Sequence, residues 1–169
     1  MHRLRRAVAA TLLVTLPAVA CTGDDDGPSA TLDDPTTTTG GSTVQAEVEA
    51  EVEAAYLRSW EVYAHALRTL STAGLEESFA GAALASTIAE VDRLRSAGTP
   101  VRMSVEHQIE IDQTSPTSAT VVDRYRNHAV LLNGTTGEPI EDDPNNLLTF
   151  SYDFKKENST WFVTFVTRL

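Results

Sequence analysis

The spacing of apolar residues changes near Pro100, from the three- and four-residue steps of a helix to strict alternation. Helical spacing covers Val44–Leu70 and Ala82–Ser96, and Gly98 stands where a left-handed helix cap is common. Alternation, typical of half-buried strands, covers Val101–Ile111, Ala119–Leu132, Leu147–Lys156 and Trp161–Leu169. This order predicts an α+β fold, in which a long N-terminal helix and two shorter helices pack on a curved antiparallel sheet of about four strands.

The long helix carries an apolar stripe that becomes aromatic in its second half. Such a stripe is more typical of a core than of a ligand site. We therefore expect Trp60, and Trp161 of the last strand, to be buried between this helix and the sheet. A short helical turn is expected at Leu75–Phe79. The stripe comprises Val48, Val52, Tyr56, Trp60, Tyr63, Ala64, Leu67 and Leu70, and the expected apolar face of the following helix comprises Leu84, Ile88, Val91 and Leu94.

The N-terminus has the plan of a secretory signal. His2–Arg6 is basic, and the following apolar run of about 14 residues is shorter than the ~20 that cross a bilayer as a helix. The run ends at Cys21, the only cysteine of the chain. Leu16–Cys21, LPAVAC, resembles the lipobox of bacterial lipoproteins, although Ala18 stands where that motif usually has leucine. The resemblance implies a signal peptide at residues 1–20, a lipid-anchored Cys21 and an extracytoplasmic location at the cell membrane. The alternative is a secreted protein with a free thiol.

Residues 21–43 are expected to form a tether, because Asp, Thr, Gly, Ser and Pro cannot bury enough apolar surface to offset their ordering entropy. The domain then spans residues 44–169, a usual size for one core. Removing the three signal arginines from the 13 basic residues leaves 10 against 24 acidic residues, a net charge of −14. This charge argues against a nucleic-acid partner, which requires a basic surface.

Two segments resemble the nuclear transport factor 2-like fold, an α+β cone. They are the strand ATVVDRY, Ala119–Tyr125, and the closing hairpin Phe150–Val166, which contains YDFKKENSTWFVTFV. The resemblance extends over about Val44–Leu169 and implies a pocket between the helices and the sheet. The fold is shared by isomerases, dehydratases, binding domains and dimerisation modules, so it implies no single activity.

Two polar residues share the predicted inner face of the sheet. His107 interrupts the apolar face of its strand, and Asp123 has the same phase as Val121 and Tyr125 on the next strand. They are the candidate acid–base pair of an enzyme. We expect the pocket to be used for binding, so Asp123→Asn should change ligand binding and leave the fold intact. The alternative is that they are hydrogen-bonded structural groups. The expected lining comprises Tyr56, Trp60, Tyr63, His107, Asp123, Tyr125 and Tyr152.

Three functions fit these features. The first is a membrane-anchored extracytoplasmic domain without catalysis, which binds a protein partner or a small amphipathic ligand. The second is an enzyme of the isomerase or dehydratase type that uses His107 and Asp123. The third is an assembly module whose sheet pairs with a second copy. The histidines lack metal-ligand spacing and no glycine-rich phosphate loop is present, so no metal and no cofactor are expected.

Overall fold

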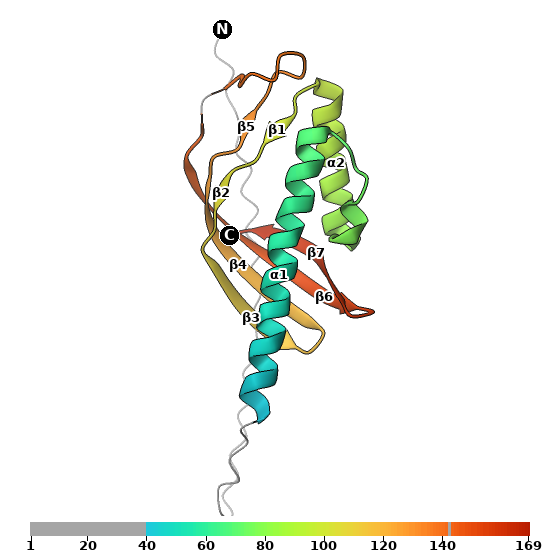
Figure 1. The fold of residues 1–169 in the computed structure, drawn as a ribbon, viewed down its shortest axis with the longest axis vertical. Helices are drawn as coiled ribbons and strands as arrows, with labels where there is room; N and C mark the ends of the chain where they lie inside the picture. Colours follow the sequence, from blue (N-terminus) through green and yellow to red (C-terminus); the bar gives the residue numbers. More distant parts are fainter. Residues whose placement is uncertain (1–39, 142) are drawn as a thin grey trace, which may run out of the picture. The chain divides into compact units, whose positions relative to one another are not determined.

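The computed structural model describes residues 40–141 and 143–169. Cys21, the signal sequence and most of the expected tether lie outside the described residues. Figure 1 shows the elements in chain order. They are α1 (Gly40–Thr69), a short 3-10 helix η1 (Leu75–Glu77), α2 (Gly81–Ala97), β1 (Val101–Arg102), β2 (Val105–Glu106), β3 (Ile109–Ser115), β4 (Ser118–Asn127), β5 (Val130–Leu131), β6 (Asn146–Glu157) and β7 (Thr160–Arg168).

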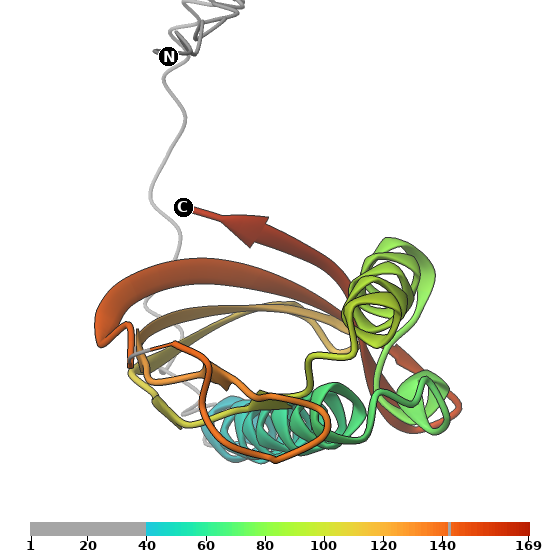
Figure 2. The same cartoon turned by 90° about the horizontal axis from the view of Figure 1, so that it is seen from above.

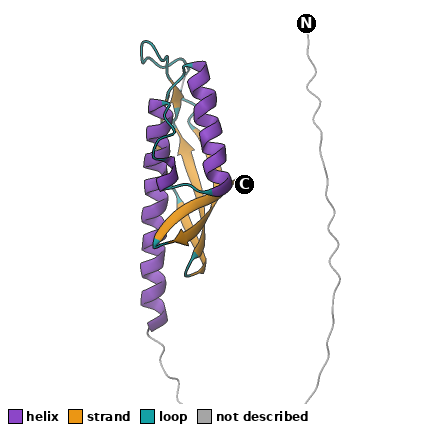
Figure 3. Cartoon of the chain, turned by 90° about the vertical axis from the view of Figure 1, so that its right-hand side faces the viewer, coloured by secondary structure: helices purple, strands orange, loops and turns teal. Residues whose placement is uncertain are grey.

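The helices follow the predicted plan closely. Helix α1 begins at Gly40, four residues before the expected Val44. Its residues 43–47 are exposed, and Figures 1 and 3 show this end extending beyond the strands. Helix α2 ends at Ala97, where Gly98 adopts the expected left-handed cap with φ of 65°. Its backbone N–H donates to the carbonyl oxygens of Leu94 and Arg95, which stabilises the helix end.

The sheet is antiparallel and curves around α1, as Figure 2 shows. Its strands pair in the order β2-β4-β6-β7, with β3 also paired to β4 and a separate two-stranded pair β1-β5. The segment Val101–Ile111, predicted as one strand, is divided into three. Its register is nevertheless continuous, since Val101 lies opposite Leu131, Val105 opposite Asn127 and Ile109 opposite Asp123. The alternation therefore predicted the inward side chains correctly and missed only the interruptions.

A bulge in β7 changes the phase of the last strand. Asp153 pairs with Phe165 and Phe154 with Val163, so Thr164 is the extra residue. The prediction of one uninterrupted alternation to Leu169 is therefore wrong. Trp161 and Val163 point inward as expected, but beyond the bulge Phe165 is 50% exposed and Val166 packs against the core.

The core lies between α1, α2 and the concave face of the sheet. Both tryptophans are buried, Trp60 with 9% and Trp161 with 6% exposure, as predicted. The predicted face of α2 was shifted, because Leu84 and Ile88 are only partly buried. Ala83 and Thr87 take the fully packed positions beside Val91 and Leu94, which turns a small and polar part of α2 towards the sheet.

Candidate functional site

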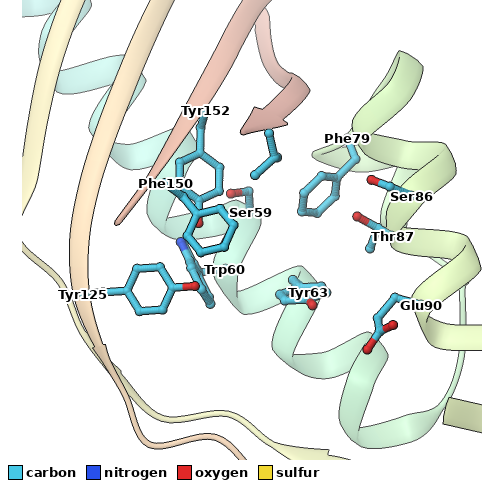
Figure 4. Close-up of a pocket in the computed structure, with 11 residues that line it drawn as sticks. Ser59, Trp60, Tyr63, Phe79, Ser86, Thr87, Glu90, Tyr125, Phe150 and Tyr152 are labelled. Atoms are coloured by element: carbon cyan, nitrogen blue, oxygen red, sulfur yellow. The ribbon is translucent and has the colours of Figure 1, made fainter. Parts of the chain in front are cut away.

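A cavity of about 210 Å³ lies between the two helices and the sheet. Figure 4 shows its side chains converging from α1, α2, the sheet and the segment between the helices. Aromatic rings form most of the side next to α1 and the sheet, and α2 contributes the polar side chains of Ser86, Thr87 and Glu90 on the other side, which we call the polar wall. It is lined by Ser59, Trp60, Tyr63, Phe79, Ser86, Thr87, Glu90, Tyr125, Phe150, Tyr152 and Val166.

The apolar wall is built from aromatic rings that meet mainly edge to face. The ring of Trp60 lies 5.1 Å from that of Tyr125 and 5.9 Å from that of Tyr63, with interplanar angles of 76° and 71°. Tyr125 stacks on Phe150 at 5.9 Å. These arrangements are the favoured ones for aromatic pairs and fix the rings in place. Trp60 and Tyr63 come from one face of α1, Tyr125 comes from β4, and Phe150 and Tyr152 come from alternate positions of β6. Phe79, between η1 and α2, adds one more ring.

The polar wall presents hydrogen-bond acceptors. On the polar wall, the hydroxyls of Ser86 and Thr87 donate to the carbonyl of Ala83, at 3.0 and 2.8 Å. A further hydroxyl, that of Ser59 on α1, lies beside the aromatic rings and donates to the carbonyl of Tyr56 at 2.7 Å. While each hydroxyl keeps its bond to a helix carbonyl, its oxygen can accept a hydrogen bond from a ligand but does not donate one.

Glu90 adds a carboxylate to this wall. Its two oxygens accept from the guanidinium of Arg93, one turn further along α2, at 2.7 and 2.9 Å. This pairing lowers the pKa of Glu90, so the group is charged at neutral pH. The side chain of Arg93 is itself 63% exposed and does not line the cavity.

The tyrosines of the cavity stay protonated. Burial raises the pKa of Tyr63 and of Tyr125 to about 12, and it also raises that of Tyr152. They therefore offer neutral hydroxyl groups at physiological pH. The indole nitrogen Nε1 of Trp60 is buried and has no hydrogen-bond partner in the described part of the chain.

Asp123 lies outside the cavity lining, in a separate buried network. Its side chain has no exposed surface. Oδ2 accepts from the hydroxyl of Tyr56 at 2.6 Å and lies 2.5 Å from Nδ1 of His107, while Oδ1 accepts from the backbone N–H of Gln108 at 2.9 Å. Burial and these contacts raise the pKa of Tyr56, which keeps its hydroxyl as a donor. The network joins α1 to the interruption between β2 and β3.

The structure thus divides the seven residues expected to line one pocket. Trp60, Tyr63, Tyr125 and Tyr152 line the cavity, whereas Tyr56, His107 and Asp123 do not. An acid–base pair must reach the substrate or a bound water. With no exposed surface, Asp123 can orient His107 but cannot itself touch a ligand in the cavity.

Sequence reasoning missed seven of the lining residues. Phe150 shares the predicted inner face of its strand and could have been included. Val166 enters only because of the bulge in β7, and the side chains of α2 enter only because that helix is rotated from its expected face. The seven are Ser59, Phe79, Ser86, Thr87, Glu90, Phe150 and Val166.

Two further observations concern residues 40–141 and 143–169. No cluster of His, Cys, Asp or Glu in these ranges could hold a metal ion. No helix in them is long and apolar enough to cross a membrane.

No family model matches the sequence. No curated protein matches it either. Solved structures do match the fold. The intermembrane space region of the chloroplast protein ARC6 is 14% identical with a TM-score of 0.52, over 66% of this chain and 92% of that chain.

Two bacterial structures match at TM-scores below 0.5. A provisionally assigned scytalone dehydratase from Novosphingobium aromaticivorans is 14% identical with a TM-score of 0.47, over 73% of this chain and 91% of its own. A nuclear transport factor 2-like protein of unknown function from Shewanella oneidensis is 14% identical with a TM-score of 0.45, over 69% and 97%. At such identities a likeness concerns the fold alone. The described domain is therefore an α+β cone, with a long N-terminal helix and a shorter helix packed on a curved antiparallel sheet.

Proposed function

We propose that the chain is a lipoprotein of the extracytoplasmic membrane face, and that its domain binds a small amphipathic molecule without catalysis. The cavity carries this proposal. Aromatic rings supply most of its wall and a few polar side chains complete it, which is the usual composition of a small-molecule site. Its volume of about 210 Å³ suits a ligand smaller than a typical drug.

The position of Asp123 supports binding over catalysis. An isomerase or dehydratase would need its acid and base to open into the cavity. Asp123 instead has its oxygens occupied by Tyr56, His107 and the backbone of Gln108, away from the cavity. The residues that do line the cavity include one carboxylate, Glu90, and no histidine.

Ligand binding is testable by thermal unfolding in the presence of a panel of small aromatic and amphipathic molecules. A ligand at 100 times its Kd is expected to stabilise the domain by about 2.7 kcal/mol. Val166→Trp should abolish this gain, because its indole fills the cavity. Thr167→Trp is the matched control, since Thr167 is exposed on the same strand. A panel without any stabilising member, or equal stabilisation of both variants, would contradict the proposal.

The membrane anchor has its support in the N-terminal sequence, where a basic patch, a short apolar run and LPAVAC precede the polar segment. Two acyl chains on one cysteine are sufficient for stable anchoring. Cys21→Ala is expected to move the protein from the membrane fraction to the medium, or to leave it as an uncleaved precursor. Fractionation and the intact mass of the mature N-terminus measure this. A mature wild-type protein with a free thiol at Cys21 would show that the anchor is wrong.

A further inference from the structure

We propose that the cavity selects a small organic ammonium ion with an apolar body, the chemistry of choline and related methylated amines. This inference rests on the proposed function and adds the ligand class. It follows from three properties of the wall: the direction of its hydrogen bonds, its aromatic faces and its charge.

The polar side of the cavity favours a ligand that donates or carries positive charge. The hydroxyls of Ser86 and Thr87 both donate to the carbonyl of Ala83, so while they keep these bonds they present acceptor oxygens to a ligand. Glu90 adds a carboxylate, which is also acceptor-only. A ligand with a carboxylate or phosphate would face these oxygens without a donor on that side.

The opposite side offers electron-rich rings. Trp60, Tyr63, Tyr125 and Tyr152 line the same space, and Trp60 lies 5.1 to 6.4 Å from the other three ring centroids. A cation within about 6 Å of such a ring face is attracted by the ring quadrupole, and aromatic cages for methylated ammonium groups use this effect. Burial keeps the tyrosines neutral, so their rings keep the electron-rich faces that attract a cation.

The charge of the wall agrees with a cation. Its ionisable residues, apart from the neutral tyrosines, consist of Glu90 alone, and no lysine, arginine or histidine lines the cavity. Arg93 neutralises part of the Glu90 charge from the solvent side. The Glu90–Arg93 pair therefore sets the net charge next to the polar wall. Removing the charge of Glu90 and removing the charge of Arg93 should have opposite effects on the affinity for an ammonium ion.

Choline and its neutral carbon isostere, 3,3-dimethylbutan-1-ol, provide a direct comparison. We would measure both by calorimetry on the full chain in phosphatidylglycerol nanodiscs, because these lipids have no ammonium headgroup. Choline is expected to bind about tenfold more tightly than the isostere, the difference that a partly desolvated cation–π site provides. Equal affinities, or tighter binding of the isostere, would overturn the ammonium proposal and leave the binding function in place.

Variants of the ion pair sharpen the comparison. Glu90→Gln should lower choline affinity severalfold, and Arg93→Gln should raise it, with the isostere unchanged in both. Glu61→Gln is the control, because Glu61 is exposed on α1 and does not line the cavity. The same direction of change in both ion-pair variants would contradict the proposal. If neither probe binds, the ammonium proposal fails, and the thermal panel decides separately whether the cavity binds any ligand.

Discussion

Asp123→Ala is expected to lower the free energy of unfolding by about 3–5 kcal/mol, the usual loss when one member of a buried ionisable pair is removed. The substitution takes away the acceptor for the hydroxyl of Tyr56 and the backbone N–H of Gln108, and the partner of Nδ1 of His107. Buried donors left without acceptors each add a desolvation cost. The effect is large because the side chain of Asp123 is fully buried and water cannot replace it.

Denaturant unfolding followed by circular dichroism measures this loss. Asp112→Ala is the matched control, because Asp112 is exposed on the neighbouring strand β3 and should change stability by less than about 0.5 kcal/mol.

The sequence alone predicted that Asp123→Asn would leave the fold intact and change ligand binding. The network revises this expectation: an amide in place of Oδ2 would oppose the hydroxyl of Tyr56, so stability should fall. An Asp123→Ala or Asp123→Asn variant as stable as the wild type would contradict the structural role of Asp123.

Trp161→Ala is expected to cost about 3–5 kcal/mol, the typical loss for truncating a buried large aromatic residue. The indole lies where the β6–β7 hairpin meets α1, and its Nε1 donates to Glu51 at 3.1 Å. Lys156 donates to the same carboxylate and lies over the indole ring. The substitution therefore loosens three contacts, which are Trp161–Glu51, Trp161–Lys156 and Lys156–Glu51. Equilibrium unfolding in urea measures the change, with Trp161→Phe as the milder comparison. A loss below about 1 kcal/mol would place Trp161 outside the core.

The layer order and the inward faces were predictable because they depend on local periodicity. Alternation in Val101–Ile111 places His107 beside apolar neighbours, and the structure keeps that phase through both interruptions. The cap at Gly98 is similarly local, since a residue without Cβ suits the left-handed region. The turn at Asn158 and Ser159, with φ of 48° and 68°, joins the two strands of the closing hairpin that the sequence indicated.

The cavity was only partly predictable, because its shape depends on features without a local signal. The bulge at Thr164 is one extra residue in a strand that reads as regular, yet it exchanges Phe165 for Val166 on the inner face. The rotation of α2 depends on tertiary packing, which buries the small Ala83 and leaves Leu84 only partly buried. Neighbouring elements also decide which inward polar side chain lines the cavity. Asp123 and Tyr125 share one face of β4, yet Tyr125 lines the cavity and Asp123 is buried in a separate network.

The two tryptophans permit one measurement that tests the cavity as a binding site. The chain has two indole N–H groups. That of Trp60 is buried, on a side chain that lines the cavity, and that of Trp161 donates to Glu51. In a proton–nitrogen NMR titration with choline, or with any stabilising member of the ligand panel, we expect the indole signal of Trp60 to shift and that of Trp161 to stay in place. A stabilising ligand that shifts only the Trp161 signal, or neither signal, would show that it binds elsewhere and would contradict the proposed site.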